Sequence, residues 1–295
     1  TTGVIGALEL SPPGGDILPH EHTTPKARSD RLDLLRACRA NTSAIWGLSL
    51  AKGLTDLLPV DREPHAVVDD GEGVVHTVWI VDDPGTCAAV AAAVEAQPVV
   101  IADGHHRYET SLAYRREREQ AEGDAGPAAA TLAYLVELVE DELTVRAIHR
   151  LVTGLPAGTD PAAALEPWFE PAGPPPAGVP VTAAMAQAGA LCAVTPAGEV
   201  LLRPRPEALG EARDLDSARL DVALAGLGRP AVRFQHGVDN VRAAVAAGEA
   251  ELGVLLRPAT VAQIEATAHG GERMPPKTTF FHPKPKTGLV FRDLG

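Results

Sequence analysis

Short, compactly apolar segments alternate with longer segments of mixed polarity along most of this chain. The apolar segments are too short for helices and predict strands, at residues 3–10, 44–50, 74–81 and 99–102. In the mixed segments, leucine, valine or alanine positions recur with helical spacing and predict helices, at residues 29–39, 86–96 and about 107–122. Strands that alternate with helices are typical of an α/β protein, here expected to contain mixed α+β sheets.

The second half of the chain continues this alternation after two features of its own. Apolar segments at 131–139 and 143–148 flank an acidic Glu-Asp-Glu and predict a β-hairpin. Residues 171–180 are rich in proline and glycine, which is typical of a linker or a surface loop. The remaining pattern predicts strands at 190–194, 200–202 and 252–256 and helices at 215–227, 238–247 and 260–269. We therefore expect two regions, residues 1–152 and residues 153–295.

Charge and composition narrow the classes of partner. The 295 residues include 39 acidic and 26 basic side chains, a formal net charge of −13. Such a surface repels a phosphate backbone, so nucleic-acid binding is not expected without a concentrated basic patch. No apolar run reaches the roughly 18 residues of a membrane span, and the N-terminus lacks a signal-peptide pattern. The three cysteines lack a Cys-x-x-Cys spacing, which favours a reducing cytoplasmic location over a disulfide framework or a zinc site.

The segment that follows the predicted strand 99–102 carries the most chemistry. It reads Asp103, Gly104, His105, His106 and Arg107, and the predicted helix begins directly after it. The first amides of a helix and its dipole suit phosphate oxygens. Gly104 lets the backbone approach a ligand, Arg107 offers a fork of donors, the histidines can donate or move protons, and Asp103 can hold Mg²⁺. The alternative is that Asp103 only caps the helix and both histidines lie on a surface turn.

Residues 101–110 resemble the signature of the bacterial and archaeal family catalogued as domain of unknown function one thousand and fifteen. Further matching segments follow in the family's order, at 18–23 with 31–36, at 147–150 and at 271–284. Two departures stand out. The family's N-terminal Pro-Pro-Tyr-Asp-type segment is missing, so we expect a shortened member, and His22 stands where the family usually has arginine.

The resemblance implies a fold and an activity. The family is similar to the ParB and sulfiredoxin group, in which a helix N-terminus binds nucleotide phosphates, and free serine kinases of that group have a similar turn. It therefore implies a ParB/sulfiredoxin-like region at 1–152, and ATP- or ADP-dependent phosphoryl transfer with Mg²⁺ to a small hydroxylated metabolite such as a free amino acid. Sulfiredoxin chemistry is not expected, because no cysteine occupies the turn.

Two other segments carry candidate site residues. In the polar segment 20–23, Glu21 is the candidate general base beside the catalytic candidates His105 and His106, although local packing of a polar loop explains the segment equally well. In the Met-Pro-Pro-Lys-Thr-Thr loop that ends the region 153–295, Lys277 and Thr278 are candidate phosphate ligands, and Lys284 and Lys286 extend its positive charge.

Two alternative functions stay open, together with the roles of several further residues. A ParB-like nucleotide-binding regulator without catalysis is one alternative function. A metal-dependent hydrolase is another, with ligands drawn from His20, His22, Asp103, His105 and His106. His149 and Arg150 are interpreted as a strand-end pair, with the alternative that they point into the same cleft as the candidate site. Trp46, Trp79 and Trp168 are interpreted as core residues.

Overall fold

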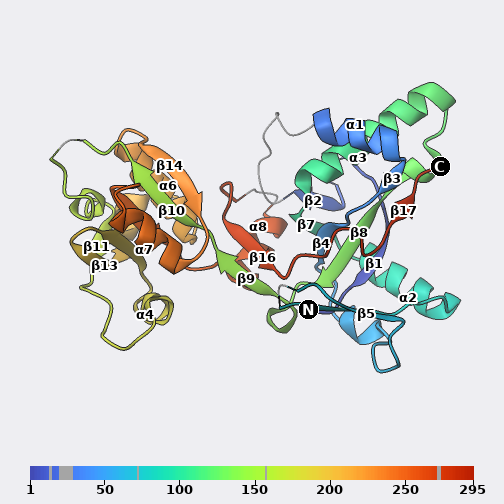
Figure 1. Ribbon diagram of the computed structural model, residues 1–295, viewed down its shortest axis with the longest axis horizontal. Helices are drawn as coiled ribbons and strands as arrows, with labels where there is room; N and C mark the ends of the chain where they lie inside the picture. Colours follow the sequence, from blue (N-terminus) through green and yellow to red (C-terminus); the bar gives the residue numbers. More distant parts are fainter. Residues whose placement is uncertain (13–14, 20–28, 72, 157, 271–273) are drawn as a thin grey trace. The chain divides into compact units, whose positions relative to one another are not determined.

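The computed structural model describes residues 1–12, 15–19, 29–71, 73–156, 158–270 and 274–295. It divides into two compact units (Figure 1). The first comprises Thr1–Thr144, Ile264–Arg273 and Phe281–Gly295, and the second comprises Val145–Gln263 and Met274–Phe280. A two-stranded sheet of β9 (Thr144–Ala147) and β16 (Thr279–His282) contains two of the points at which the chain passes from one unit to the other.

The first unit is built on a five-stranded sheet with the order β1-β8-β4-β7-β2. Its strands are β1 (Val4–Glu9), β8 (Ala130–Glu137), β4 (Ile45–Ser49), β7 (Val99–Asp103) and β2 (Ile17–Pro19). β1 is antiparallel to β8 and β4 is antiparallel to β7, whereas β8 with β4 and β2 with β7 run parallel. The expected mixed sheet is therefore present.

The helix α3 (His105–Glu122) covers one face of this sheet. Tyr108 and Leu112 of α3 pack against Ile45, Ile101 and Ala133 of the strands, because the sheet residues on that face are apolar at alternate positions. On the opposite face the ring of Trp46 contacts those of Tyr134 and Phe281. The core of the first unit therefore lies on both faces of the sheet.

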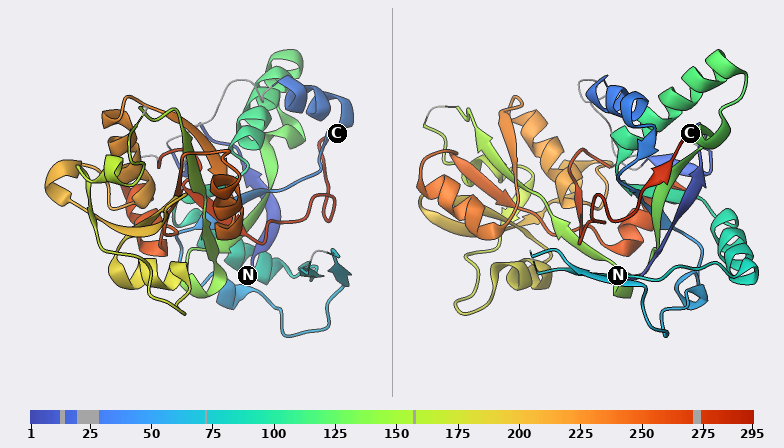
Figure 2. Two further views of the ribbon diagram at one scale, coloured as in Figure 1. Left: turned by 60° about the vertical axis from the view of Figure 1, so that its left-hand side comes forward. Right: turned by 45° about the vertical axis from the view of Figure 1, so that its right-hand side comes forward.

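Shorter elements complete the first unit. α1 (Ser29–Cys38) packs on α3, and α2 (Pro84–Glu95) begins at the N-cap Asp83, whose carboxylate accepts from Thr86 N. The β5–β6 hairpin (Ala66–Asp69 and Val75–Val78) lies at the end of the unit opposite α1 and α3 (Figures 1 and 2). The remaining short elements are β3 (Ala40–Asn41), β17 (Arg292–Asp293), and 3-10 turns at Thr55–Leu57, Gly126–Ala129 and Glu140–Glu142.

The second unit is built on a six-stranded antiparallel sheet with the order β11-β13-β12-β15-β10-β14. Its strands are β11 (Phe169–Pro171), β13 (Gly198–Pro204), β12 (Leu191–Thr195), β15 (Leu252–Leu255), β10 (His149–Thr153) and β14 (Ala231–Gln235). α4 (Val181–Ala188) and α7 (Val238–Ala246) cover one face, and α6 (Asp216–Gly226) covers the other. Side chains of β12 alternate between the two faces of the sheet, so Cys192 packs against α4 and α7 whereas Ala193 packs against α6. The short elements are the 3-10 turn Ala163–Leu165 and α5 (Pro206–Leu209), and α8 (Val261–His269) crosses from the second unit into the first.

Several sequence-based expectations need correction. Residues 131–148 do not form a hairpin, because β8 pairs with β1 and β4 whereas β9 pairs with β16. Alternation shows that a strand is half-buried, but it does not identify the partner strand. For residues 171–180 the surface-loop alternative is confirmed, because they lie within the second unit and are mostly exposed; they do not link the two units. Trp46 is fully buried and Trp168 packs, partly buried, against the core of the second unit, as expected, whereas Trp79 is only partly buried.

No helix in the described ranges combines the length and the apolar character that crossing a membrane would require.

Candidate functional site

The buried strand β7 leads directly into a glycine turn at the start of α3. The side chains at 99–101 are at most 2% exposed, so the position of the strand end is fixed by the core. Gly104 follows as the N-cap of α3 with φ 97°, a left-handed conformation that favours glycine. The helix begins at His105, two residues earlier than the sequence predicts, and its first internal bond joins Tyr108 N to Gly104 O at 2.9 Å.

The first turn of α3 has the features of an anion site. The amides of an opening turn lack partners within the helix, and the N-cap Gly104 has no side chain with which to accept from them. The first turn also contains no acidic residue. Because α3 is 18 residues long, its aligned peptide dipoles add positive partial charge at this end. A negatively charged group would therefore be stabilised here.

Two cationic side chains share the carboxylate of Asp103 beside this turn. Nη2 of Arg107 donates to Asp103 Oδ2 at 2.6 Å, and Nζ of Lys284 donates to Asp103 Oδ1 at 2.5 Å. Nη1 of Arg107 donates to Ser43 Oγ and to the carbonyl oxygen of Ala44. Arg107 therefore ties the turn to the residues that precede β4, and both terminal nitrogens of the fork predicted to bind phosphate already have protein partners.

The surroundings of Asp103 favour its ionised form. Burial by itself raises the pKa of this carboxyl group, but the hydrogen bond and charge of Lys284, together with the charges of Arg107 and His105, outweigh burial and lower the pKa. Burial is also the largest influence on Arg107 and lowers its pKa; Asp103 opposes that effect, and a like charge on Arg31 adds to it. Since a guanidinium remains protonated in proteins, the turn holds a fixed arrangement of charges at neutral pH.

Replacing Gly104 by alanine should lower the free energy of unfolding by about 2 kcal/mol, because two penalties add. The φ angle of 97° is strained for alanine, and the new Cβ would meet Nη2, Cζ and Nε of Arg107 at 3.0–3.1 Å. Gly123→Ala at the C-cap of the same helix is the matched control, since φ is 79° there and a Cβ would meet nothing within 4 Å. Urea unfolding of both variants measures the difference. Equal losses would contradict a role for the Arg107 contact.

The two histidines of the turn are half-buried at the start of α3. Nδ1 of His106 is buried and has no hydrogen-bond partner among the described residues. The carbonyl oxygen of His106 accepts from Thr110 Oγ1 at 2.7 Å, which fixes the backbone of this residue in the helix. A buried ring nitrogen without a partner is uncommon in folded proteins and is an available group for a ligand.

The predicted ligands Lys277 and Thr278 belong to the second unit. Lys277 is exposed and adopts φ 58°, and its carbonyl oxygen accepts from Arg150 Nη1 at 3.1 Å. The Thr278 hydroxyl is buried, donates to Pro275 O at 2.7 Å, and lies 2.9 Å from Ser217 Oγ. The hydroxyl of Thr278 therefore forms a hydrogen bond within its own loop. Contact of Lys277 and Thr278 with phosphate stays a prediction.

Three further predicted site residues belong to the polar segment 20–23. Glu21, with His20 and His22, lies outside the described residues. Among the residues that the structure describes, no three His, Cys, Asp or Glu side chains gather as a metal site would require. Ser43, which accepts a hydrogen bond from Arg107, was not predicted from the sequence. Its only signal was its place immediately before the predicted strand 44–50.

The comparisons with known proteins support the fold. The family model described as "Protein of unknown function (DUF1015)" matches residues 1–223. SbnI with a C-terminal truncation, from Staphylococcus aureus, is similar in structure with a TM-score of 0.52 and 12% identity, over 96% of this chain and 85% of that chain. This likeness concerns the fold alone. No curated protein is similar enough in sequence to count as a match.

Two further solved structures are similar at lower scores. A free serine kinase variant in complex with AMP has a TM-score of 0.49 and 13% identity, over 97% of this chain and 89% of that chain. A conserved hypothetical protein from Pyrococcus furiosus has a TM-score of 0.46 and 13% identity, over 100% of this chain and 96% of that chain.

Proposed function

The chain belongs to the DUF1015 family of proteins of unknown function, and we propose that it is a nucleotide-dependent phosphotransferase. Its acceptor in this proposal is a small hydroxylated metabolite such as a free amino acid, and its phosphate donor is ATP or ADP. The observation that carries the proposal is the meeting of Arg107 and Lys284 at the first turn of α3.

The net charge at this turn is positive, whereas the net charge of the whole chain is negative. Two cations, Arg107 and Lys284, share one carboxylate, and the helix dipole adds to the positive excess. The chain as a whole carries a formal charge of −13. A local positive excess in an acidic protein selects for a small anion that fits the turn and not for a long polyanion. The phosphates of a nucleotide meet that description.

Asp103 fits the role of a magnesium ligand. It is ionised, and Mg²⁺ is usually bound by one or two carboxylates together with substrate phosphates and water. Bound Mg²⁺ would neutralise charge that develops on the phosphates. In this proposal Lys284 leaves Asp103 Oδ1 and turns to a phosphate oxygen, while Arg107 keeps Asp103 and the turn in position.

The transfer itself needs a base near the acceptor hydroxyl. The hydroxyl oxygen attacks the terminal phosphorus, the bond from that phosphorus to the nucleotide oxygen breaks, and the hydroxyl proton passes to a carboxylate. Glu21 is proposed for this role. The free Nδ1 of His106 and the ring of His105 are proposed to hydrogen-bond the transferred group, which would place both histidines among the catalytic residues.

Calorimetric titration with ATP and ADP, with and without Mg²⁺, tests the proposal. Lys284→Met should weaken nucleotide binding at least tenfold, the loss expected for one charge-assisted contact of about 1.4 kcal/mol. Lys286→Met is the matched control, because its side chain is similarly exposed and also ion-paired, with Asp70 at 3.8 Å. Absence of binding to the native chain, or equal weakening by both variants, would exclude the proposed site.

Activity separates a phosphotransferase from a nucleotide-binding regulator. Phosphorus NMR of the native chain with ATP or ADP, Mg²⁺ and a panel of hydroxylated amino acids should show a new phosphoester. Glu21→Gln should retain nucleotide binding and lose the phosphoester signal, because the amide cannot accept the proton. Binding without transfer to any acceptor of the panel would favour the regulator.

A further inference from the structure

A buried hydrogen-bond donor in the first unit has no acceptor. Trp46 on β4 is 0% exposed, and its indole Nε1 has no hydrogen-bond partner in the part of the chain that the structure describes. An indole nitrogen can only donate. Leaving a buried donor unpaired costs free energy, so buried polar groups of native proteins are nearly always bonded to protein, water or a ligand. The indole N–H of Trp46 is therefore an available donor for a bound ligand.

The pairing of β4 with β7 places Trp46 next to Asp103. The two residues lie directly opposite each other, and the register shifts between Trp46 and Gly47, which pairs with Ile101. β7 therefore contains one extra residue, Ala102, as in a β-bulge. Without the bulge Asp103 would point to the face that α3 covers, as Ile101 does. With it, the side chains of Trp46 and Asp103 share the other face of the sheet, because directly opposite residues do so.

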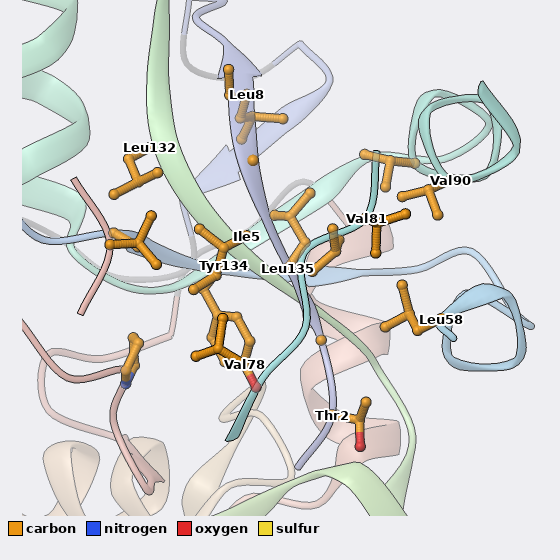
Figure 3. Close-up of a pocket in the computed structure, with 18 of the residues that line it drawn as sticks. Thr2, Ile5, Leu8, Leu58, Val78, Val81, Val90, Leu132, Tyr134 and Leu135 are labelled. Carbon is orange, nitrogen blue, oxygen red and sulfur yellow. The ribbon is translucent and has the colours of Figure 1, made fainter. Parts of the chain in front are cut away.

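The side chains that pack on Trp46 connect it to the lysine of the candidate site. The ring of Trp46 lies 5.6 Å from that of Phe281 and 5.8 Å from that of Tyr134, between centroids. Phe281 is 2% exposed and precedes Lys284 by three residues, and the Lys284 ammonium donates to Asp103 Oδ1 at 2.5 Å. Tyr134 and Lys284 both line a cavity of about 1160 Å³, and Figure 3 shows Tyr134 in its wall. Trp46 therefore contacts the wall of the cavity that Lys284 also lines.

We propose that Trp46 is a ligand-binding residue and that its indole N–H donates to an anionic oxygen of the ligand bound beside Asp103. This inference rests on the proposed function, in which Lys284 leaves Asp103 when a nucleotide binds. A ligand oxygen then takes the place of the ammonium group, on the face of the sheet that carries the indole. Two ligands of the proposed reaction have such an oxygen, in the phosphates of the nucleotide and in the carboxylate of an amino acid acceptor.

The chemistry of this side chain suits binding better than packing. Phenylalanine at position 46 would complete the aromatic cluster without a buried donor that lacks an acceptor. A hydrogen bond formed away from water is stronger than one at the surface. A site with a buried donor also rejects a ligand that lacks the matching acceptor, because the donor is then left unpaired. Trp46 therefore adds selectivity for an oxygen at this position of the ligand.

The indole proton of Trp46 provides a direct measurement. The chain contains three tryptophans, and proton–nitrogen correlation spectra of Trp79→Phe and Trp168→Phe identify two of the indole signals, so the third belongs to Trp46. Addition of ADP with Mg²⁺, or of L-serine, to the native chain should move the Trp46 signal downfield as the hydrogen bond forms. The indole of Trp79, which already donates to Arg62 O at 2.8 Å, is the internal reference and should not move. The ligand that moves the signal shows whether phosphate or carboxylate is the acceptor.

Calorimetric titration with the same two ligands completes the test. Trp46→Phe should bind about tenfold more weakly, the loss expected for one hydrogen bond to a charged acceptor. Trp168→Phe is the matched control in the second unit and should bind as the native chain does. If Trp46→Phe does not fold, the spectra of the native chain decide alone.

The outcomes separate this inference from the proposed function. Binding of either ligand with an unmoved Trp46 signal would show that the indole bonds to water or stays unpaired, and would overturn this inference alone. A folded Trp46→Phe variant that binds as tightly as the native chain would do the same. Absence of binding of both ligands to the native chain would overturn the proposed function together with this inference.

Discussion

Replacing Arg150 by methionine should lower the free energy of unfolding of the second unit by about 3 kcal/mol. Arg150 is 2% exposed, and its guanidinium donates to the carbonyl oxygens of Ile148 at 2.6 Å, Lys277 at 3.1 Å and Pro276 at 3.3 Å. It also lies over the ring of Phe234, with Cζ 4.5 Å from the centroid. Methionine fills much of the volume but donates to none of these carbonyl groups.

The loss should have a local signature. Hydrogen exchange should accelerate at residues 274–280, because two of the three carbonyl contacts of Arg150 hold that segment. Arg146→Met is the control, since it removes the same charge from an exposed position of the second unit. A loss below about 1 kcal/mol, or equal losses in both variants, would show that Arg150 does not organise this loop.

Acidification should destabilise the second unit by about 3 kcal/mol between pH 7 and pH 4 through His149 alone. Burial, followed by the charges of Arg150 and His236, lowers the pKa of His149 to about 4, from an ordinary value near 6.5. The folded chain therefore takes up the proton only near pH 4, whereas the unfolded chain takes it up near pH 6.5. Stability from this residue is complete above about pH 6.5 and is lost as the pH falls towards 4.

The variant His149→Gln tests this pH dependence. Glutamine retains an acceptor for the amide of Leu256, which donates to His149 Nδ1 at 3.2 Å, and it does not titrate. Denaturant unfolding at pH 7 and pH 4.5, followed by hydrogen exchange in β10 and β15, should show a smaller pH effect in the variant. His269→Gln at an exposed position should behave as the native chain does. An undiminished pH effect in His149→Gln would assign the acid sensitivity to other groups.

Local signals in the sequence predicted most helices and many strands, since each depends on the periodicity of a single segment. Five of the six helices expected by periodicity, at 29–39, 86–96, 215–227, 238–247 and 260–269, correspond to α1, α2, α6, α7 and α8, and the sixth is α3 with an earlier start. The early start of α3 follows from the positive φ of Gly104, which a sequence does not show. Eight strands were not predicted, namely β2, β3, β5, β10, β11, β14, β16 and β17. Six of these are only two to four residues long, which is too short for a periodic pattern to show.

Within the candidate site, the residues that are contiguous in the sequence were predicted, and their partners from distant segments were not. The run from Asp103 to Arg107 was recognisable because its chemistry is contiguous: a buried strand, a glycine and four polar residues. Its partners were not recognisable in the same way. Ser43 reaches Arg107 across 64 positions of the chain, and Lys284 reaches Asp103 across 181.

The sequence by itself determined the mixed α/β class, the acidic charge and the strand-turn-helix segment in which an anion can bind, because each follows from neighbouring residues. Only the tertiary structure decided which cations share Asp103, why residues 131–148 form no hairpin, and that β1 is the end strand of the first unit's sheet among the described residues. The physical reason is that periodicity fixes which face of an element is buried. The choice of partner depends on packing free energy summed over residues far apart in the chain.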